Sequence, residues 1–150
     1  MRIGVPKEIK PFENRVGLTP ASVREIIGND HDVLVETNAG HAIGFDDTDY
    51  EAAGASIASK AADIFADSDM IVKVKEPQAP EIAMLRDGQI LFTYLHLAPD
   101  VRQTTGLLES GCTGIAYETV TDDRGGLPLL APMSEVAGRM AVQAGATCLE

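Results

Sequence analysis

Three side chains that can carry positive charge, Arg15, Lys75 and His96, each follow a short apolar run that predicts a β-strand. The three expected strands are residues 2–5, 70–75 and 89–95, respectively. In an open parallel sheet, ligands bind outside the carboxyl ends of the strands. We therefore expect these side chains to meet at one edge of a sheet and to form a pocket for a small carboxylate.

The three residue types suit different chemical tasks. The planar guanidinium of Arg15 can pair with a carboxylate through two parallel hydrogen bonds. The ammonium of Lys75 is a compact charge that can polarise a carbonyl group. His96 can give and take a proton near neutral pH, because the ordinary histidine pKa is about 6.5. Together they fit the reduction of a 2-oxo acid, in which negative charge grows on the C2 oxygen.

Each of these residues also has a structural interpretation. Arg15 is compatible with an arginine of a surface loop, and His96 with a histidine of the core. Lys73 and Lys75 are compatible with charges that protect an edge strand from aggregation. We interpret Lys73 alone as structural. Residue types and spacing by themselves predict an α/β domain that binds an anion.

The elements that must position these residues alternate along the chain. Apolar runs predict strands at residues 2–5, 33–36, 70–75, 89–95 and 114–117. Helical patterns lie at residues 20–27, 47–53, 57–65, 80–85, 99–111 and from 134 to the last residue. Thr19 is suited to the N-cap of the first helix and Pro20 to its first position. Strands separated by helices predict parallel β–α units and an α/β fold.

The composition narrows the possible partners. The 150 residues include 12 Lys and Arg against 23 Asp and Glu, which gives a net charge of −11. Such a surface repels phosphate backbones and anionic lipids, so nucleic acid and membrane surfaces are not expected partners. No signal-type segment or run of 18 apolar residues is present, and Cys112 and Cys148 lack metal-site spacing. These features predict a cytoplasmic protein without a metal.

Several segments are similar to one family. Residues 1–8, Asn14-Arg15-Val16 and Thr19-Pro20 resemble the signature of the alanine dehydrogenases and the related pyridine nucleotide transhydrogenases. The resemblance continues through residues 74–77, 89–97, 116–119 and 129–139, so it spans essentially the whole chain. This family often has Glu-x-Arg-Val-Ala in its first motif, and here Gly17 stands in place of the alanine.

The resemblance implies roles for individual residues. Arg15 and Lys75 match the substrate-binding pair, and His96 matches the catalytic acid/base, with Lys75 also polarising the substrate. Three further positions match: Tyr94 and Met133 lie near the substrate, and Ser134 touches the nicotinamide cofactor. The implied reaction is the reversible NAD-dependent oxidative deamination of L-alanine to pyruvate and ammonium.

The resemblance also implies an architecture. Residues 1–130 are expected to form the amino-terminal part of a parallel-sheet substrate domain of flavodoxin-like or Rossmann-like type. Residues 131–150 are expected to begin a helix that leads into an NAD-binding domain beyond Glu150. No G-x-G-x-x-G motif is present in the chain. The chain is therefore expected to be a fragment that neither binds NADH measurably nor oxidises alanine alone, while the whole enzyme is expected to be a homo-oligomer, usually a hexamer.

Two other functions compete with this interpretation. A transhydrogenase amino-terminal domain, or more remotely a saccharopine-type relative, belongs to the same family. A transhydrogenase uses no small acid and has no need for Lys75 or His96. From a different class, the chain could be a non-catalytic module that binds an anion. A strand followed by a glycine-rich fingerprint downstream of Glu150 would favour the enzyme.

Overall fold

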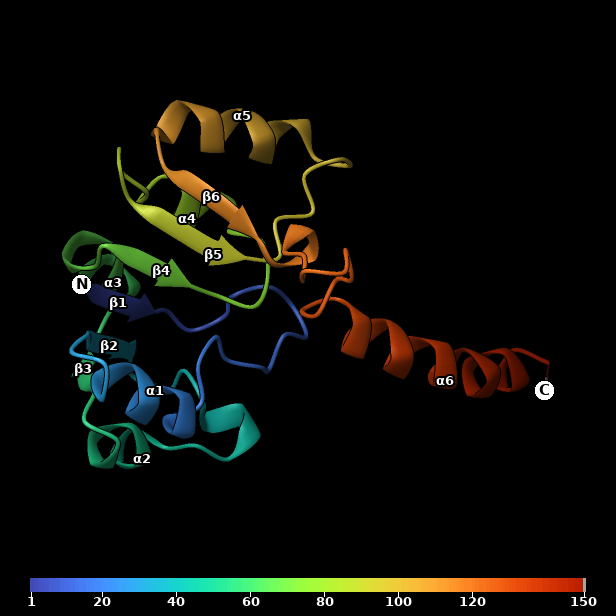
Figure 1. Ribbon diagram of the computed structural model, residues 1–150, viewed down its shortest axis with the longest axis horizontal. Coiled ribbons are helices and arrows are strands. Elements are labelled where there is room, and N and C mark those ends of the chain that lie inside the picture. The colour runs from blue at the N-terminus through green and yellow to red at the C-terminus, as the bar shows by residue number, and fades with distance from the viewer. Residues whose placement is uncertain (150) are drawn as a thin grey trace. The chain divides into compact units, whose positions relative to one another are not determined.

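The computed structural model describes residues 1–149, and its first unit is a sheet with helices packed around it (Figure 1). Within these residues, six strands form one sheet in the order β3-β2-β1-β4-β5-β6. Their bounds are Arg2–Val5 for β1, Asp32–Glu36 for β2, Ser56–Ala58 for β3, Met70–Val72 for β4, Ile90–Thr93 for β5 and Thr113–Ala116 for β6. Strand β1 pairs in parallel with β2 and β4, and the pairs β2–β3 and β4–β5 are parallel too. This confirms the predicted α/β fold, and the order is the Rossmann one.

Helices connect the strands. The α-helices of the described residues are α1 (Pro20–Ile27), α2 (Asp47–Ala52), α3 (Ala61–Asp67), α4 (Ala79–Ile82), α5 (Val101–Ser110) and α6 (Ala131–Thr147). Short 3-10 helices lie at His41–Ile43 (η1) and Tyr117–Thr119 (η2). The predicted start of the first helix is confirmed, because the Thr19 side chain accepts a hydrogen bond from the Ser22 amide at 3.3 Å.

Several predicted elements differ from the structure. The strands predicted for residues 70–75 and 89–95 are shorter, at Met70–Val72 and Ile90–Thr93. The helix predicted for residues 57–65 is instead strand β3 followed by α3. Apolar runs this short do not distinguish a strand from a buried helix by their periodicity. The last helix begins at Ala131, with a proline in its first turn, and its C-cap is Cys148. The prediction that it continues to the last residue is therefore wrong at Leu149, and Glu150 lies outside the described residues.

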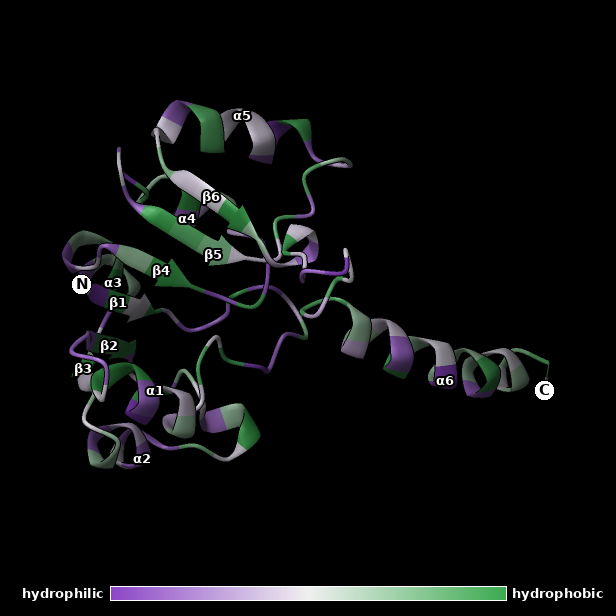
Figure 2. Ribbon diagram, in the orientation of Figure 1, coloured by the Kyte–Doolittle hydropathy of each residue, from purple (hydrophilic) through white to green (hydrophobic). Residues whose placement is uncertain are grey.

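The core holds the first strands in place. Val5, Val33, Val35 and Tyr50 are almost completely buried in one hydrophobic cluster. In Figure 2 the hydrophobic colour is also strong along β4 and β5. The Tyr50 hydroxyl donates to the Leu18 carbonyl at 3.0 Å, and burial raises the Tyr50 pKa to about 12. This cluster fixes the loop that leads from β1 into α1.

The strand order creates a switch point. From β1 the chain proceeds outward to β2 and β3, and then returns to the other side of β1 to form β4. The loops after β1 and β4 therefore diverge at the carboxyl edge, which leaves a crevice where ligands bind in such sheets. Residues 1–115 form one compact unit, and a second unit begins at Ala116.

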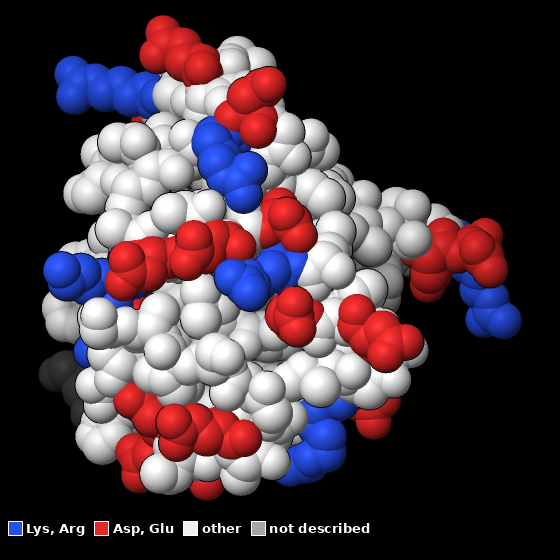
Figure 3. All heavy atoms as spheres, turned by 90° about the vertical axis from the view of Figure 1, so that its left-hand side faces the viewer, with Lys and Arg blue, Asp and Glu red and all other residues white. Residues whose placement is uncertain are grey.

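Acidic side chains form several groups on the face drawn in Figure 3, with basic side chains between them. Within residues 1–149, no helix is long and apolar enough to cross a membrane. The same residues contain no cluster of three His, Cys, Asp or Glu side chains that could hold a metal ion.

Candidate functional site

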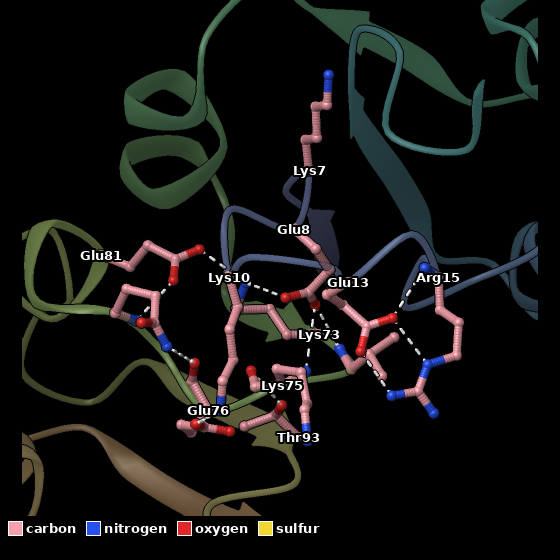
Figure 4. A network of polar contacts seen from close by, with 12 residues as sticks. Lys7, Glu8, Lys10, Glu13, Arg15, Lys73, Lys75, Glu76, Glu81 and Thr93 are labelled. Atoms are coloured by element: carbon pink, nitrogen blue, oxygen red, sulfur yellow. Dashed lines mark hydrogen bonds and ion pairs between the residues drawn. The ribbon is translucent and has the colours of Figure 1, made fainter. Parts of the chain in front are cut away.

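Arg15 lies in the loop between β1 and α1, where its guanidinium pairs with Glu13 (Figure 4). Nε donates to Oε1 of Glu13 at 2.8 Å, and Nη2 donates to Oε2 at 2.6 Å. The Arg15 amide donates to Oε1 as well, at 2.9 Å. The Glu13 side chain is 7% exposed and that of Arg15 is 47% exposed. The pairing therefore uses the inner edge of the guanidinium and leaves its outer part accessible.

Electrostatic effects connect Arg15 to its neighbours. The hydrogen bond from Arg15 lowers the pKa of Glu13, and the charge of Lys75 lowers it further. The hydrogen bond to Glu13 raises the pKa of Arg15, with smaller contributions from Tyr94 and Glu8. Charges influence one another in this way only at short range, because salt and water screen distant pairs. The structure thus brings Arg15, Lys75 and Tyr94 into one electrostatic neighbourhood.

Lys75 follows β4, and both polar groups of its backbone are held by side chains. Its amide and that of Val74 donate to Oε1 of Glu8, at 3.3 and 2.6 Å. Its carbonyl accepts from the Thr93 hydroxyl at 2.9 Å. The side chain is half-buried, and its ammonium makes no hydrogen bond or ion pair to any residue from 1 to 149. A held backbone with an unpaired ammonium is suited to binding an anion.

Lys73 is buried with two carboxylates. Its ammonium lies 2.7 Å from Oε1 of Glu81 and 3.1 Å from Oε2 of Glu8, and the three side chains are between 0% and 2% exposed. We call Glu8, Lys73 and Glu81 the buried ionic cluster. The edge-strand interpretation of Lys73 and Lys75 is wrong, because β4 lies between β1 and β5. Lys73 is structural through its ion pairs.

His96 and Tyr94 follow β5. The Tyr94 amide donates to the Val74 carbonyl at 3.3 Å, so the two chains stay paired beyond the strand ends. His96 is exposed and has a φ of 50°, in the left-handed region that few residues other than glycine adopt. The interpretation of His96 as a core histidine is therefore wrong. Left-handed backbone of this kind is often found at functional sites.

Met133 and Ser134 lie in the first turn of α6, in the second unit. Met133 is 36% exposed, and the Ser134 hydroxyl donates to the Leu130 carbonyl at 3.4 Å. Their predicted roles toward substrate and cofactor stay predictions.

The first unit does not fit a dinucleotide, despite its Rossmann strand order. Such a site needs a short glycine-rich turn from β1 into a helix whose amino terminus receives the pyrophosphate. Here residues 6–19 separate β1 from α1, and the amino terminus of α1 is capped by Thr19. The glycine of this loop, Gly17, packs against β4, where a Cβ atom would meet the Val72 carbonyl oxygen at 2.5 Å.

Comparison with known proteins agrees with this geometry. The family model for the N-terminal domain of alanine dehydrogenase/PNT matches residues 4–137. The chain belongs to this family. An alanine dehydrogenase of Halomonas elongata is 61% identical over all 150 residues, and one of Bacillus subtilis is 55% identical over the same length. The chain spans 40% and 39% of the length of these two relatives.

Solved structures of the family have the same fold. An L-alanine dehydrogenase is 51% identical, with a TM-score of 0.92 over 100% of this chain and 41% of that one. A transhydrogenase from Sinorhizobium meliloti is 30% identical, with a TM-score of 0.77 over 83% of this chain and 37% of that one. The similarity is thus greater to the alanine dehydrogenase.

Three residues that hold the site were not predicted from the sequence: Glu8, Glu13 and Thr93. Glu13 was detectable, because a carboxylate two residues before an arginine can reach its guanidinium. Glu8 contacts Lys73 across 65 positions of sequence. The signal for it was indirect: a lysine in an apolar run needs a buried partner of opposite charge.

Proposed function

We propose that the protein to which this chain belongs is an alanine dehydrogenase, which catalyses the reversible NAD-dependent oxidative deamination of L-alanine to pyruvate and ammonium. The observation that carries this proposal is a pair of cations near Glu13: the half-buried, unpaired ammonium of Lys75 and the partly exposed guanidinium of Arg15, both of which lower the pKa of Glu13. Two cations at the switch point of a parallel sheet are suited to a small 2-oxo acid or amino acid.

In this proposal Arg15 and Lys75 have different roles in binding the substrate. The outer edge of the Arg15 guanidinium pairs with the carboxylate of pyruvate or alanine. The Lys75 ammonium supports the same carboxylate and polarises the C2 oxygen, where negative charge develops when ammonia adds to C2. Glu8 and Thr93 keep Lys75 in place from both sides of its backbone.

His96 is the proposed acid/base. It gives a proton to the departing oxygen when ammonia replaces it, and it takes a proton from water in the reverse direction. Tyr94 and Met133 are the proposed further contacts to the substrate, and Ser134 is the proposed contact to the cofactor. Acceptance of a hydride from alanine, and its return in the reverse direction, is the chemistry that bound NAD would supply. Because the first unit lacks a pyrophosphate cradle, we assign the dinucleotide to segments outside it.

The assembly and compartment are also proposals. We propose a homo-oligomer, a hexamer as the family resemblance implies, located in the cytoplasm. The transhydrogenase alternative has less support, because the identity to that structure is 30% against 51–61% for alanine dehydrogenases. A transhydrogenase also has no need for a lysine and a histidine at the positions of Lys75 and His96.

Steady-state kinetics of the full-length protein test the proposal. We expect His96→Asn to lower kcat roughly 10²-fold or more in both directions, the usual loss when an acid/base is removed. Arg15→Lys keeps the charge and loses the paired hydrogen bonds, so the KM for pyruvate should rise roughly tenfold or more. Normal kinetics in both variants, or no alanine oxidation by the unaltered protein, would contradict the proposed function.

A further inference from the structure

The candidate site contains a protein carboxylate, that of Glu13. It pairs with Arg15, the residue that is proposed to bind the substrate carboxylate. Glu13 accepts hydrogen bonds from Nε and Nη2 of Arg15 at 2.8 and 2.6 Å (Figure 4). An arginine side chain has a second edge, formed by Nη1 and the remaining hydrogen of Nη2. Within residues 1–149, Nη1 makes no hydrogen bond. One edge is therefore used inside the protein and the other is available.

The exposed fractions of the two side chains show that Glu13 is the fixed partner of the pair. The Glu13 side chain is 7% exposed, whereas that of Arg15 is 47% exposed. Glu13 is also fixed to the backbone, since the Arg15 amide donates to the same Oε1 atom at 2.9 Å. A carboxylate that is buried and held at two places on Arg15 behaves as part of the framework, not as a mobile competitor of the substrate.

We propose, resting on the proposed function, that Glu13 is a positioning residue: it fixes the guanidinium of Arg15 so that the edge carrying Nη1 receives the substrate carboxylate. An arginine side chain has much rotational freedom, and ordering it at the moment of binding costs free energy. Glu13 removes that freedom in advance. The Glu13 carboxylate also has an unfavourable effect on binding. Its negative charge lies near Lys75 and weakens the attraction of Lys75 for the substrate carboxylate.

This arrangement predicts that the effect of Glu13 depends on Arg15. When Arg15 is present, Glu13→Gln should raise the KM for pyruvate roughly tenfold, the scale of one charge-assisted hydrogen bond, with kcat changed less than about twofold. When Arg15 is replaced by alanine, Glu13 is left as a carboxylate beside the unpaired Lys75 ammonium. In that background Glu13→Gln should lower the KM, because it removes a competitor for Lys75.

Two further variants separate position from charge. Glu13→Asp keeps the charge, but its side chain is too short to span both guanidinium nitrogens, so the KM should still rise several-fold. Glu76→Gln is the matched control: the charge of Lys75 lowers the pKa of Glu76 as it does that of Glu13, but Glu76 pairs with Lys10 and not with Arg15. We expect its KM to stay within about twofold of the unaltered protein.

The test is the KM and kcat for pyruvate of these variants in the full-length protein, with circular dichroism to verify folding. A rise of the KM with Glu13→Gln that reverses in the Arg15→Ala background supports the inference. An equal rise in both backgrounds, a fall in the presence of Arg15, or an equal effect of Glu76→Gln overturns it. If Arg15→Ala itself leaves the KM for pyruvate unchanged, the proposed substrate-binding role of Arg15 is wrong as well. If Arg15→Ala raises the KM and only the Glu13 variants behave differently from expectation, the inference about Glu13 alone is wrong.

Discussion

Replacing Lys73 by methionine tests whether the buried ionic cluster holds the site together. The lysine ammonium is 0% exposed, and its two carboxylate partners lie at 2.7 and 3.1 Å. The variant leaves Glu8 and Glu81 buried without a cation. Breaking a buried ion pair by removing one partner costs about 3–5 kcal/mol. We expect Lys73→Met to lower the free energy of unfolding by about 3 kcal/mol at pH 8. This is the lower end of that range, because one of the two carboxylates can take up a proton and so lose its charge.

The loss of stability caused by Lys73→Met should grow as pH rises. Burial raises the pKa of Glu81 above 4.5, although Lys73 acts against this shift. A folded-state pKa above the unfolded one gives stability that is present at low pH and is lost as pH rises through the folded pKa. Removing Lys73 takes away the group that lowers the pKa, so the variant should lose stability more steeply between pH 5 and pH 8. We expect the difference from the unaltered protein to fall below about 2 kcal/mol at pH 5.

The assay is urea-induced unfolding of the full-length protein, followed by amide hydrogen exchange of residues 70–76. This segment contains the amides of Val74 and Lys75, which donate to Glu8. Lys10→Met is the control, because it removes a similar pair with Glu76 that is 34% and 14% exposed. Such an accessible pair contributes at most about 1 kcal/mol. Equal losses in the two variants, or a loss with Lys73→Met that does not grow with pH, would refute the reasoning.

Three other outcomes are expected. Thr93→Val removes the hydrogen bond to the Lys75 carbonyl, so it should cost about 1 kcal/mol of stability in urea unfolding and raise the KM for pyruvate. His96→Gly should be more stable than His96→Ala by about 1 kcal/mol in thermal unfolding, because glycine accepts a φ of 50° without strain, while both variants lose activity. Burial alone would raise the pKa of Glu76, but the hydrogen bond from Lys10, a backbone hydrogen bond and the charges of Lys10 and Lys75 together lower it. The stabilisation from Glu76 is therefore lost as pH falls through that lowered pKa. Glu76→Gln should therefore flatten the loss of stability in acid below pH 4.5, as measured by urea midpoints.

The sequence predicted the elements well where local signals exist. The Thr19 N-cap, the helix Pro20–Ile27 and the strand Arg2–Val5 agree with the structure, because caps and apolar runs are local properties. Prediction from the sequence was wrong where the surroundings of a residue depend on the order of strands in the sheet. The charge of Lys73 was assigned to a sheet edge, and only the order of the sheet shows that β4 has neighbours on both sides.

The placement of Arg15 and Lys75 at one edge of the sheet was predictable, and the groups that hold them were not. Arg15 and Lys75 follow strands whose carboxyl ends lie at the same edge of a parallel sheet, and the strand order then makes β1 and β4 neighbours. Alternation of faces along a strand does not apply at His96, because its left-handed backbone departs from the extended conformation. The contact between Glu8 and Lys73 joins two distant segments, and no local pattern specifies it.

Gly17 explains how the loop after β1 can lie against β4 in a sheet of Rossmann strand order. A Cβ atom at this position would lie 2.5 Å from the Val72 carbonyl oxygen, closer than any real contact, so only glycine allows the loop after β1 to touch the end of β4 in this way. That contact holds the loop across the carboxyl edge, and Arg15 stands two residues before it. In a dinucleotide site the glycines instead keep the loop short and let a phosphate approach the backbone. Here the loop after β1 packs closely against β4 instead, and residues 6–19 form no short glycine-rich turn into α1.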